Sequence, residues 1–380
     1  MEVLELKTEK VIQGGEALAH LPDGRVCFVE GALKGELVHV RILKNTKDYA
    51  KGKVEAVLEP NPERVKPKCP YFDKCGGCAL QYASFPLQIQ MLKESTKDTF
   101  RRFTKQNLPE DFEIFYNKPF AYRNRARIQI LKNGWGFLGK NSHEKIKIKN
   151  CPILTDRLNN FLNHFDFSKI QAKELDVFDN GKDKIAYYYK GMPQDLFSKQ
   201  GFAFVETENK KISMDASVFF QSNLSMLPKL TSELKKNITG KNILIDLYSG
   251  VGFFSKILED NFREIYAIER DKKCLFHAKK NLGKNAFCFA ESAEIYLKNK
   301  IISEKATLIV DPPRTGLDAS VISVFAESSL KRVIYVSCNP VTFSRDAKLF
   351  FEKGYVLSYC KGFAFYPQTP HLEILSVFEK

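Results

Sequence analysis

Two residues near the carboxyl terminus have side chains suited to covalent catalysis. Cys338 lies in Tyr335-Val-Ser-Cys-Asn-Pro340 after an apolar run, and Glu373 follows Gln368-Thr-Pro-His-Leu372 and opens another run. A thiolate is a strong nucleophile, and a half-desolvated carboxyl has a raised pKa that suits a proton-accepting base. Cys338 could instead be a packing residue, because cysteine often behaves as a small hydrophobe. Its polar and turn-forming neighbours favour the catalytic interpretation.

A glycine-rich turn further upstream predicts a nucleotide-like cofactor. Gly250 and Gly252 follow an apolar run that ends near Asp246, and Glu269 stands 23 residues after that aspartate. Glycines let the backbone turn tightly beside a ligand, and an acid at about this offset can reach a pair of ribose hydroxyls. Ser255 stands where a dinucleotide fingerprint would have its third glycine. NAD is therefore disfavoured, and S-adenosylmethionine fits better.

A third motif, Val310-Asp-Pro-Pro-Arg-Thr-Gly316, again follows an apolar run. The two prolines predict a stiff, extended exit that holds Asp311 and Arg314 at the mouth of a site. Asp-Pro-Pro alone also fits enzymes that methylate exocyclic amines. Such an enzyme would have no use for Cys338.

Four of the nine cysteines are spaced as a ligand set would be. Cys69, Cys75 and Cys78 lie close together, and Cys151 lies far downstream. An odd number of cysteines without a secretory signal favours metal or catalytic use over disulfides. The first three alone are compatible with zinc as well as with an iron–sulfur cluster.

The elements that must position these residues are readable from the apolar pattern. Near-continuous apolar runs at 242–248, 265–269, 307–311 and 333–337 alternate with helical stretches, which predicts a doubly wound parallel sheet. Ligands bind such sheets beyond the carboxyl ends of the strands, where all these motifs fall.

The rest of the chain predicts two further regions. Residues 1–58 contain short strands between glycine turns and predict a small barrel. Residues 59–215 begin with a proline-rich linker at 59–68 and include a helix at about 85–107, which could pack on the catalytic domain. The catalytic domain is expected to span 216–380.

Charge points to a polyanionic partner. The chain has 59 Lys and Arg against 45 Asp and Glu, a formal net charge of +14. Arg123, Arg125 and Arg127 alternate along one predicted strand and so share a face, where they either contact nucleic-acid phosphates or pair with acids. No apolar stretch is long enough for a membrane span, and the acidic start lacks a signal peptide. We therefore expect a cytoplasmic protein without a membrane partner.

These motifs, together with Phe219-Phe-Gln-Ser-Asn223, resemble in identity and order the RNA 5-methyluridine methyltransferases, a family of uracil-C5 enzymes. The resemblance implies a class I S-adenosylmethionine methyltransferase fold, preceded by an OB-type TRAM barrel that binds RNA and a mixed α/β iron–sulfur domain. It further implies that Cys338 adds to carbon 6 of uracil and that Glu373 removes the proton from carbon 5. The implied cofactor contacts are Gln221, Tyr248, Glu269 and Asp311. Gln221 and Asp311 are also candidates for contact with the uracil, and Arg314 for contact with its carbonyl.

The resemblance also favours particular partners. The cysteine spacing is similar to that of the ribosomal-RNA members, which implies a [4Fe–4S] cluster held by Cys69, Cys75, Cys78 and Cys151. Barrel and cluster together favour a uridine of 23S rRNA over one of tRNA, and nothing requires more than a monomer. A different class of hypothesis is an RNA-binding assembly factor without catalysis, which would predict loss of Cys338 or Glu373.

Overall fold

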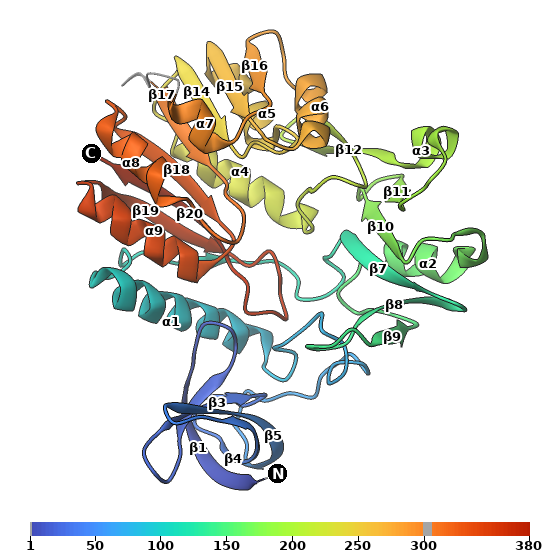
Figure 1. Cartoon of the computed structure of the whole chain (residues 1–380), viewed down its shortest axis with the longest axis vertical. Helices are drawn as coiled ribbons and strands as arrows, with labels where there is room; N and C mark the ends of the chain where they lie inside the picture. The colour runs from blue at the N-terminus through green and yellow to red at the C-terminus, as the bar shows by residue number, and fades with distance from the viewer. Residues whose placement is uncertain (1, 299–305) are drawn as a thin grey trace.

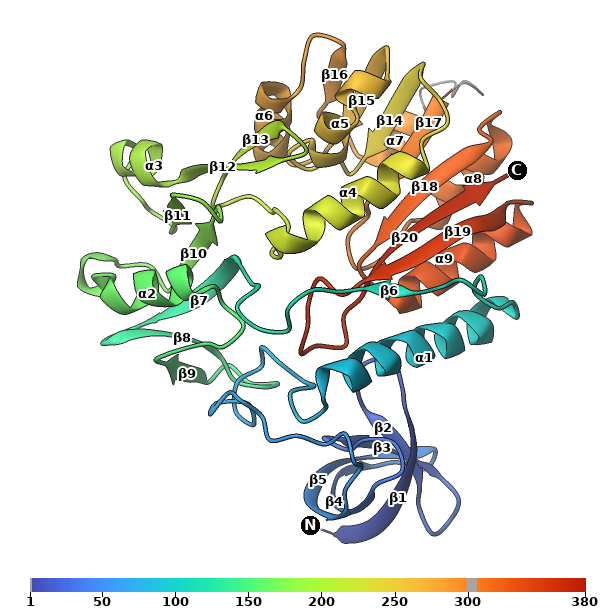
Figure 2. The same cartoon turned by 180° about the vertical axis from the view of Figure 1, so that it is seen from behind.

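The structure is a computed structural model that describes residues 2–298 and 306–380. Three regions are visible: an N-terminal barrel, a central α/β region and a large sheet flanked by helices (Figures 1 and 2). In the described part of the chain, no helix is long and apolar enough to cross a membrane.

The N-terminal region is a closed barrel with the strand order β1-β2-β3-β5-β4. Its strands are β1 (Val3–Val11), β2 (Ala17–His20), β3 (Val26–Glu30), β4 (Leu37–Asn45) and β5 (Tyr49–Glu59). Side chains alternate along β4, so Val38 and Val40 enter the core while Arg41 faces solvent. Arg64, in the predicted linker, pairs with the fully buried Glu36 at 2.6 Å and so fastens the linker to the barrel.

The central region is built on a five-stranded sheet with the order β11-β10-β7-β8-β9. Its strands are β7 (Arg125–Leu131), β8 (Gly134–Leu138), β9 (Lys145–Ile148), β10 (Glu174–Asp179) and β11 (Ile185–Tyr188). Helix α2 (Asp156–His164) packs on this sheet. Helix α3 (Gln194–Gln200) and the hairpin of β12 (Phe202–Thr207) and β13 (Lys210–Asp215) lead to the large sheet.

The large sheet has eight strands in the order β16-β15-β14-β17-β18-β20-β19-β6. Its strands are β6 (Ile114–Phe115), β14 (Ile243–Leu247), β15 (Glu264–Ile268), β16 (Ala286–Phe289), β17 (Ala306–Val310), β18 (Arg332–Ser337), β19 (Val356–Phe363) and β20 (Glu373–Glu379). Strands β14 to β18 are parallel, and β20 is antiparallel to both β18 and β19. The four apolar runs of the sequence are thus β14, β15, β17 and β18, and the predicted doubly wound fold is confirmed.

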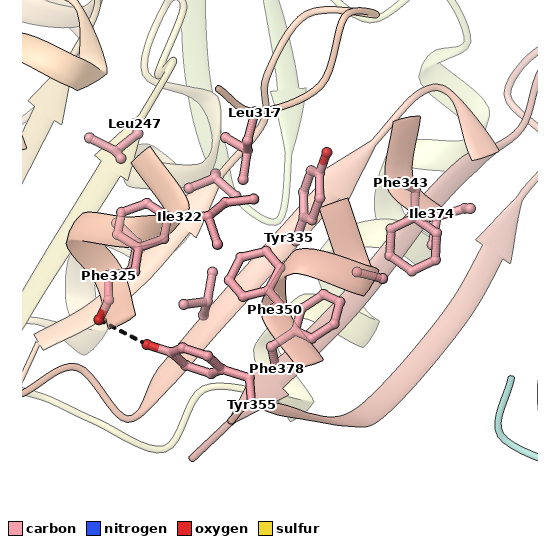
Figure 3. Packing of buried hydrophobic residues seen from close by; sticks show 14 of the residues in the cluster. Leu247, Leu317, Ile322, Phe325, Tyr335, Phe343, Phe350, Tyr355, Ile374 and Phe378 are labelled. Atoms are coloured by element: carbon pink, nitrogen blue, oxygen red, sulfur yellow. Dashed lines mark hydrogen bonds between the residues drawn. The ribbon is translucent and has the colours of Figure 1, made fainter. Parts of the chain in front are cut away.

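Helices cover both faces of this sheet. They are α4 (Leu227–Lys236), α5 (Phe253–Ile257), α6 (Lys272–Asn281), α7 (Ala293–Lys298), α8 (Ala319–Glu327) and α9 (Pro340–Glu352). On one face Phe350 stacks on Phe378 with ring centroids 4.4 Å apart, and the Tyr355 hydroxyl donates to the Phe325 carbonyl at 3.1 Å (Figure 3). Each buried aromatic of this kind contributes about 1.5–3 kcal/mol. Because Phe378 lies opposite Val333, this packing is centred on the amino end of β18.

Helix α1 (Phe85–Thr104) precedes the central sheet in sequence but lies against the large sheet in space (Figure 2). Its first turn is capped by the Ser84 side chain, which accepts from the Leu87 amide at 3.3 Å. Phe100 stacks on Phe343 of α9 at 5.8 Å. A few residues later, β6 pairs with β19 at the sheet edge. The large sheet is therefore completed by residues far upstream of it.

Candidate active site

A cavity of about 840 Å³ lies beyond the carboxyl ends of β14, β15, β17 and β18. Every residue predicted from the sequence to act in catalysis or cofactor binding lines this one cavity. These residues are Gln221, Tyr248, Glu269, Asp311, Cys338 and Glu373.

The cofactor end of the cavity is formed by the turn after β14. Tyr248, Gly250 and Gly252 have positive φ angles of 62°, 56° and 81°, a conformation that glycine adopts at little cost. The Glu269 carboxylate accepts hydrogen bonds from the Gly250 amide at 3.0 Å and from the Asp271 amide at 2.7 Å. Backbone donors therefore hold Glu269 in one orientation at the cavity wall.

Asp246 supports this turn from behind. It is fully buried, and its Oδ2 accepts both the hydroxyl (2.6 Å) and the amide (3.2 Å) of Ser255. Burial raises the pKa of Asp246 to about 7, against the opposing effect of the Ser255 hydrogen bonds. Ser255 therefore ties α5 to β14 at the position where a dinucleotide site would need glycine.

Among the residues that the structure describes, two polar atoms in the cavity wall are buried without a hydrogen-bond partner. They are Gln221 Oε1 and Ser249 Oγ, and both residues line the cofactor side. Buried polar atoms in proteins are nearly always paired, so these two are suited to the amino, hydroxyl and adenine groups of S-adenosylmethionine. Gln221 was predicted; Ser249 was missed, although it lies in the glycine-rich motif.

At the other end of the cavity, three acidic groups converge from three strands. Asp311 follows β17, Cys338 follows β18, and Glu373 begins β20, which pairs with β18 so that Ser337 lies opposite Ile374. Glu373 is 2% exposed. The antiparallel return of β20 is what brings Glu373 to Cys338, 35 residues earlier in the chain.

The electrostatics of this end favour the protonated forms. Burial, and then the charges of Glu373 and Asp311, raise the pKa of the Cys338 thiol to about 12, and Arg314 opposes them. Burial raises the pKa of Glu373 to about 7, also against Arg314. Burial and the charge of Glu373 raise the pKa of Asp311 well above its ordinary value. Like charges so close in a dry site cannot all ionise together.

The Asp-Pro-Pro segment is held against α9 by its last residues. Gly316 has a φ of 77°, and a Cβ there would come within 2.6 Å of Asp346 Oδ2, so a larger residue would displace the loop. The Arg314 carbonyl accepts from Asn339 Nδ2 at 3.2 Å. This arrangement places the side chains of Asp311 and Arg314 in the cavity wall.

Two residues of the loop before Glu373 were given no role from the sequence. Tyr366 lines the cavity, and burial with the charge of Glu373 raises its pKa above its ordinary value. Burial and the positive charges of Arg314 and Arg123 lower the pKa of His371 to about 4, so this imidazole is neutral at physiological pH. Only the fold shows that Tyr366 reaches the catalytic end.

The four predicted ligand cysteines lie together, outside the cavity. Burial and the nearby charges of Cys151, Cys69 and Cys75 together raise the pKa of the Cys78 thiol to about 12, against a hydrogen bond with Gln81. All nine cysteines are free. Across residues 2–298 and 306–380, no three His, Cys, Asp or Glu side chains are arranged to hold a single metal ion.

The three alternating arginines have different environments. Arg127 donates to both carboxylate oxygens of Asp176, at 2.9 and 3.2 Å, so the acid-paired alternative is correct for it. Arg123 donates to the Arg125 carbonyl, and Arg125 to the Val218 carbonyl. Neither has an acidic partner in the part of the chain that the structure describes. The Arg125 guanidinium lies 5.9 Å from the ring of Phe219, which is 59% exposed.

Comparison with known proteins identifies two families in the chain. Residues 2–54 match the TRAM domain, and residues 289–380 match the tRNA (Uracil-5-)-methyltransferase family. An uncharacterized RNA methyltransferase of Treponema denticola is 32% identical, with 99% of this chain and 98% of the relative covered. The 23S rRNA (uracil(1939)-C(5))-methyltransferase RlmD of Shewanella amazonensis is 27% identical, with 99% and 95% covered.

A solved structure has the same fold. The crystal structure of Pyrococcus abyssi tRNA (uracil-54, C5)-methyltransferase in complex with S-adenosyl-L-homocysteine gives a TM-score of 0.74 at 20% identity. It covers 98% of this chain and 99% of that one. The barrel, the sheet with its cavity and the full-length relatives agree with one another. The chain belongs to the uracil-C5 RNA methyltransferases, S-adenosylmethionine-dependent enzymes, and carries an N-terminal TRAM domain.

Proposed function

We propose that this enzyme methylates carbon 5 of a uridine in 23S ribosomal RNA through a covalent adduct between Cys338 and carbon 6 of the base. The observation that carries the proposal is the convergence of Cys338, Glu373 and Asp311 at one end of the cavity that Glu269 lines at the other end.

Cys338 begins the reaction because carbon 5 of uracil is a poor nucleophile. Its thiol gives up its proton to water, the sulfur adds to carbon 6, and the electron pair of the 5,6 double bond moves to an enolate over carbon 5 and the 4-oxygen. Arg314 lowers the pKa of the thiol, and its positive charge suits the enolate oxygen. S-adenosylmethionine, when bound, supplies an electrophilic methyl group, which carbon 5 takes as the carbon–sulfur bond of the cofactor breaks.

Glu373 ends the reaction. Its carboxylate takes the proton from carbon 5, the double bond re-forms, and the bond from carbon 6 to Cys338 breaks to release the thiolate. A pKa of about 7 is well matched to a general base at neutral pH.

The remaining cavity residues hold the two substrates. Glu269, fixed by two backbone amides, suits the ribose hydroxyls, while Gln221 and Tyr248 contact the rest of the cofactor. Gln221 and Asp311 also face the uracil. A uridine in folded RNA would have to leave its stack to enter the cavity.

The RNA-binding surface extends beyond the barrel to the edge strand β9. Lys145, Lys147 and Lys149 alternate along this edge and are exposed. None of them has an acidic partner among the described residues. Phosphate contacts by unpaired lysines supply affinity without sequence information.

We further propose that Cys69, Cys75, Cys78 and Cys151 hold a [4Fe–4S] cluster. The proposal is supported by their proximity, since the charges of Cys69, Cys75 and Cys151 all raise the pKa of Cys78. Cys75 also bridges to Gly139 in the central region. Such a cluster would use all four thiolates and would tie the linker to the basic central region. Zinc is the alternative; iron and sulfide analysis of anaerobically purified protein separates the two.

The choice of RNA rests on the full-length similarity to the 23S enzyme of Shewanella together with the barrel and the cysteines. The test is transfer of labelled methyl groups to unmodified 23S rRNA and to unmodified tRNA, followed by nucleoside analysis. We expect 5-methyluridine in 23S rRNA alone. Label in tRNA alone would assign the enzyme to the tRNA branch.

A further inference from the structure

The loop between β19 and β20 is held by residues from several distant parts of the chain. This loop, residues 364–372, carries Tyr366 and ends at Glu373, and it runs from the large sheet towards the start of α1 (Figures 1 and 2). Its carbonyl oxygens accept from Asn223 Nδ2 (Phe365, 3.1 Å), the Tyr122 hydroxyl (Pro367, 2.8 Å), the amides of Ala79 and Leu80 (Gln368, 2.8 and 3.0 Å) and Gln13 Nε2 (Pro370, 3.0 Å).

The donors come from every region of the protein. Gln13 lies in the first turn of the barrel, Ala79 directly follows the predicted ligand Cys78, and Tyr122 precedes the central sheet. A loop fixed at four carbonyls by three regions has few ways to move independently of them.

The centre of this arrangement is a reciprocal pair of glutamines. Gln88 Nε2 donates to Gln368 Oε1 at 3.0 Å, and the Gln368 amide donates to Gln88 Oε1, also at 3.0 Å. Both side chains are 2% exposed, and Gln88 Nε2 also reaches the Ala83 carbonyl at 2.9 Å. Gln368 has a φ of 71°, which a non-glycine residue keeps only when its surroundings hold it there.

We propose that Gln88 and Gln368 are positioning residues for the methyl transfer. Through the loop they fix Tyr366 and Glu373 with respect to Cys338. The same loop joins the barrel, through Gln13, and the cysteine segment, through Ala79, to the catalytic carboxyl. The proposal rests on the role of Glu373 as the base. Removing one glutamine would leave buried polar groups unpaired, and the loop could satisfy them only by moving.

The central test is Gln88→Met, which keeps the length of the side chain and removes its two hydrogen bonds with Gln368 and its hydrogen bond to the Ala83 carbonyl. The matched control is Gln90→Met, on the exposed side of the same helix, where the Gln90 side chain donates to Glu94 and makes no other side-chain hydrogen bond within residues 2–298 and 306–380. We expect Gln88→Met to lower kcat by at least about 10-fold, because small misplacements of catalytic groups are costly. Affinity for S-adenosylmethionine should stay within about twofold of the parent, since Gln88 does not line the cavity.

The pH profile distinguishes positioning from a loss of folding. In Gln88→Met the apparent pKa of kcat should fall below that of the parent enzyme, because Glu373 leaves its buried setting. Gln88→Glu, which keeps an acceptor for the Gln368 amide, should give an intermediate kcat. If Gln88→Met does not fold, Gln13→Ala, which removes the bond to Pro370 from the barrel side, should still lower kcat.

Two results would overturn the proposal. One is a kcat for Gln88→Met equal to that of Gln90→Met. The other is a Gln88→Met variant whose melting temperature and cofactor affinity fall together with its kcat, while its pH profile stays the same as that of the parent. Glu373→Gln is measured alongside: full turnover in that variant overturns the base assignment itself, whereas an inactive Glu373→Gln with a normal Gln88→Met overturns only the positioning role.

Discussion

The two ends of the active-site cavity place a glutamate in different environments, Glu269 at the cofactor end and Glu373 at the catalytic end. Glu269 at the cofactor end belongs to a local motif. Its carboxylate accepts hydrogen bonds from two backbone amides, one of Asp271, two residues later, and one of Gly250 in the glycine-rich turn. Glu373 at the catalytic end is fully enclosed, and burial raises its pKa to about 7. The hydrogen-bonded acid is a fixed acceptor for hydroxyl groups, while the desolvated acid is suited to exchanging a proton.

The same contrast applies to the neighbours of these acids. Polar atoms at the cofactor end, such as Ser249 Oγ, are buried and unpaired, ready for a ligand. At the catalytic end, Cys338 and Asp311 share a dry site with Glu373, and each raises the cost of ionising another. The cofactor end therefore offers unpaired polar atoms to a ligand, whereas the catalytic end favours the protonated forms of its acidic groups.

The largest effect on activity is expected when the nucleophile at the catalytic end is removed, because cofactor binding at the other end should not change. Cys338→Ala should lower methyl transfer by more than about 10³-fold, because no adduct can form. Binding of S-adenosylmethionine by calorimetry should be unchanged. Cys288→Ala, on the outer strand β16, is the control. Substantial methyl transfer by Cys338→Ala would point instead to chemistry of the amine-methylating Asp-Pro-Pro type.

The next effect should come from Glu373→Gln. We expect turnover to fall by about 10²–10⁴-fold, with accumulation of a covalent complex between protein and RNA on denaturing gels. The adduct accumulates because the carbon-5 proton is no longer removed. An inactive variant that never forms the complex would show that Glu373 acts before methyl transfer.

The raised pKa of Glu373 also predicts how the free energy of unfolding depends on pH. Its pKa is higher in the folded protein than in the unfolded chain, so stability falls as pH rises from about 4.5 to about 7. At pH 8 the Glu373→Gln variant should therefore be more stable than the parent, by on the order of 3 kcal/mol. Urea denaturation at pH 5 and pH 8 checks this. An equal effect at both pH values would show that the carboxyl is not desolvated as described.

The pH dependence of kcat tests the ionisation of the base at the catalytic end without any mutation. Because the base must be ionised, kcat should rise with pH through about 7 and then level off. Cofactor binding should change little over the same interval. A kcat that is flat between pH 6 and pH 8 would contradict a base with this pKa.

The smallest effect on chemistry is expected at the cofactor end. Glu269→Gln should raise the KM for S-adenosylmethionine by about 10-fold and leave kcat at saturation within a few-fold, because the loss is one of binding. Glu264→Gln, at the exposed start of β15, the strand that Glu269 follows, is the control. A large fall in kcat with an unchanged KM would remove the distinction between the two ends.

Much of the site could be predicted because its chemistry is local in sequence. The motifs around Gly250, Asp311 and Cys338 each follow a buried strand of a parallel sheet, and parallel strands end at one edge. Ser255, which stands in place of a third glycine, donates its hydroxyl to Asp246 in the structure and so ties the turn to β14.

Other features depend on contacts between distant residues and left no local pattern. Arg127 shares its face with two other arginines in the sequence, and only the pairing of β7 with β10 brings it to Asp176. Likewise α1 and β6 complete a sheet that begins more than a hundred residues later.

The sequence by itself determined the types and order of the reacting groups, because nucleophile, acids and glycine turns must be encoded where the strands end. Only the tertiary structure decided how those groups behave. The raised pKa of Glu373, the protonated thiol of Cys338 and the pairing of Gln88 with Gln368 arise from burial and from contacts across 280 residues. Desolvation and long-range hydrogen bonding are properties of the packed chain, and no local stretch of sequence carries them.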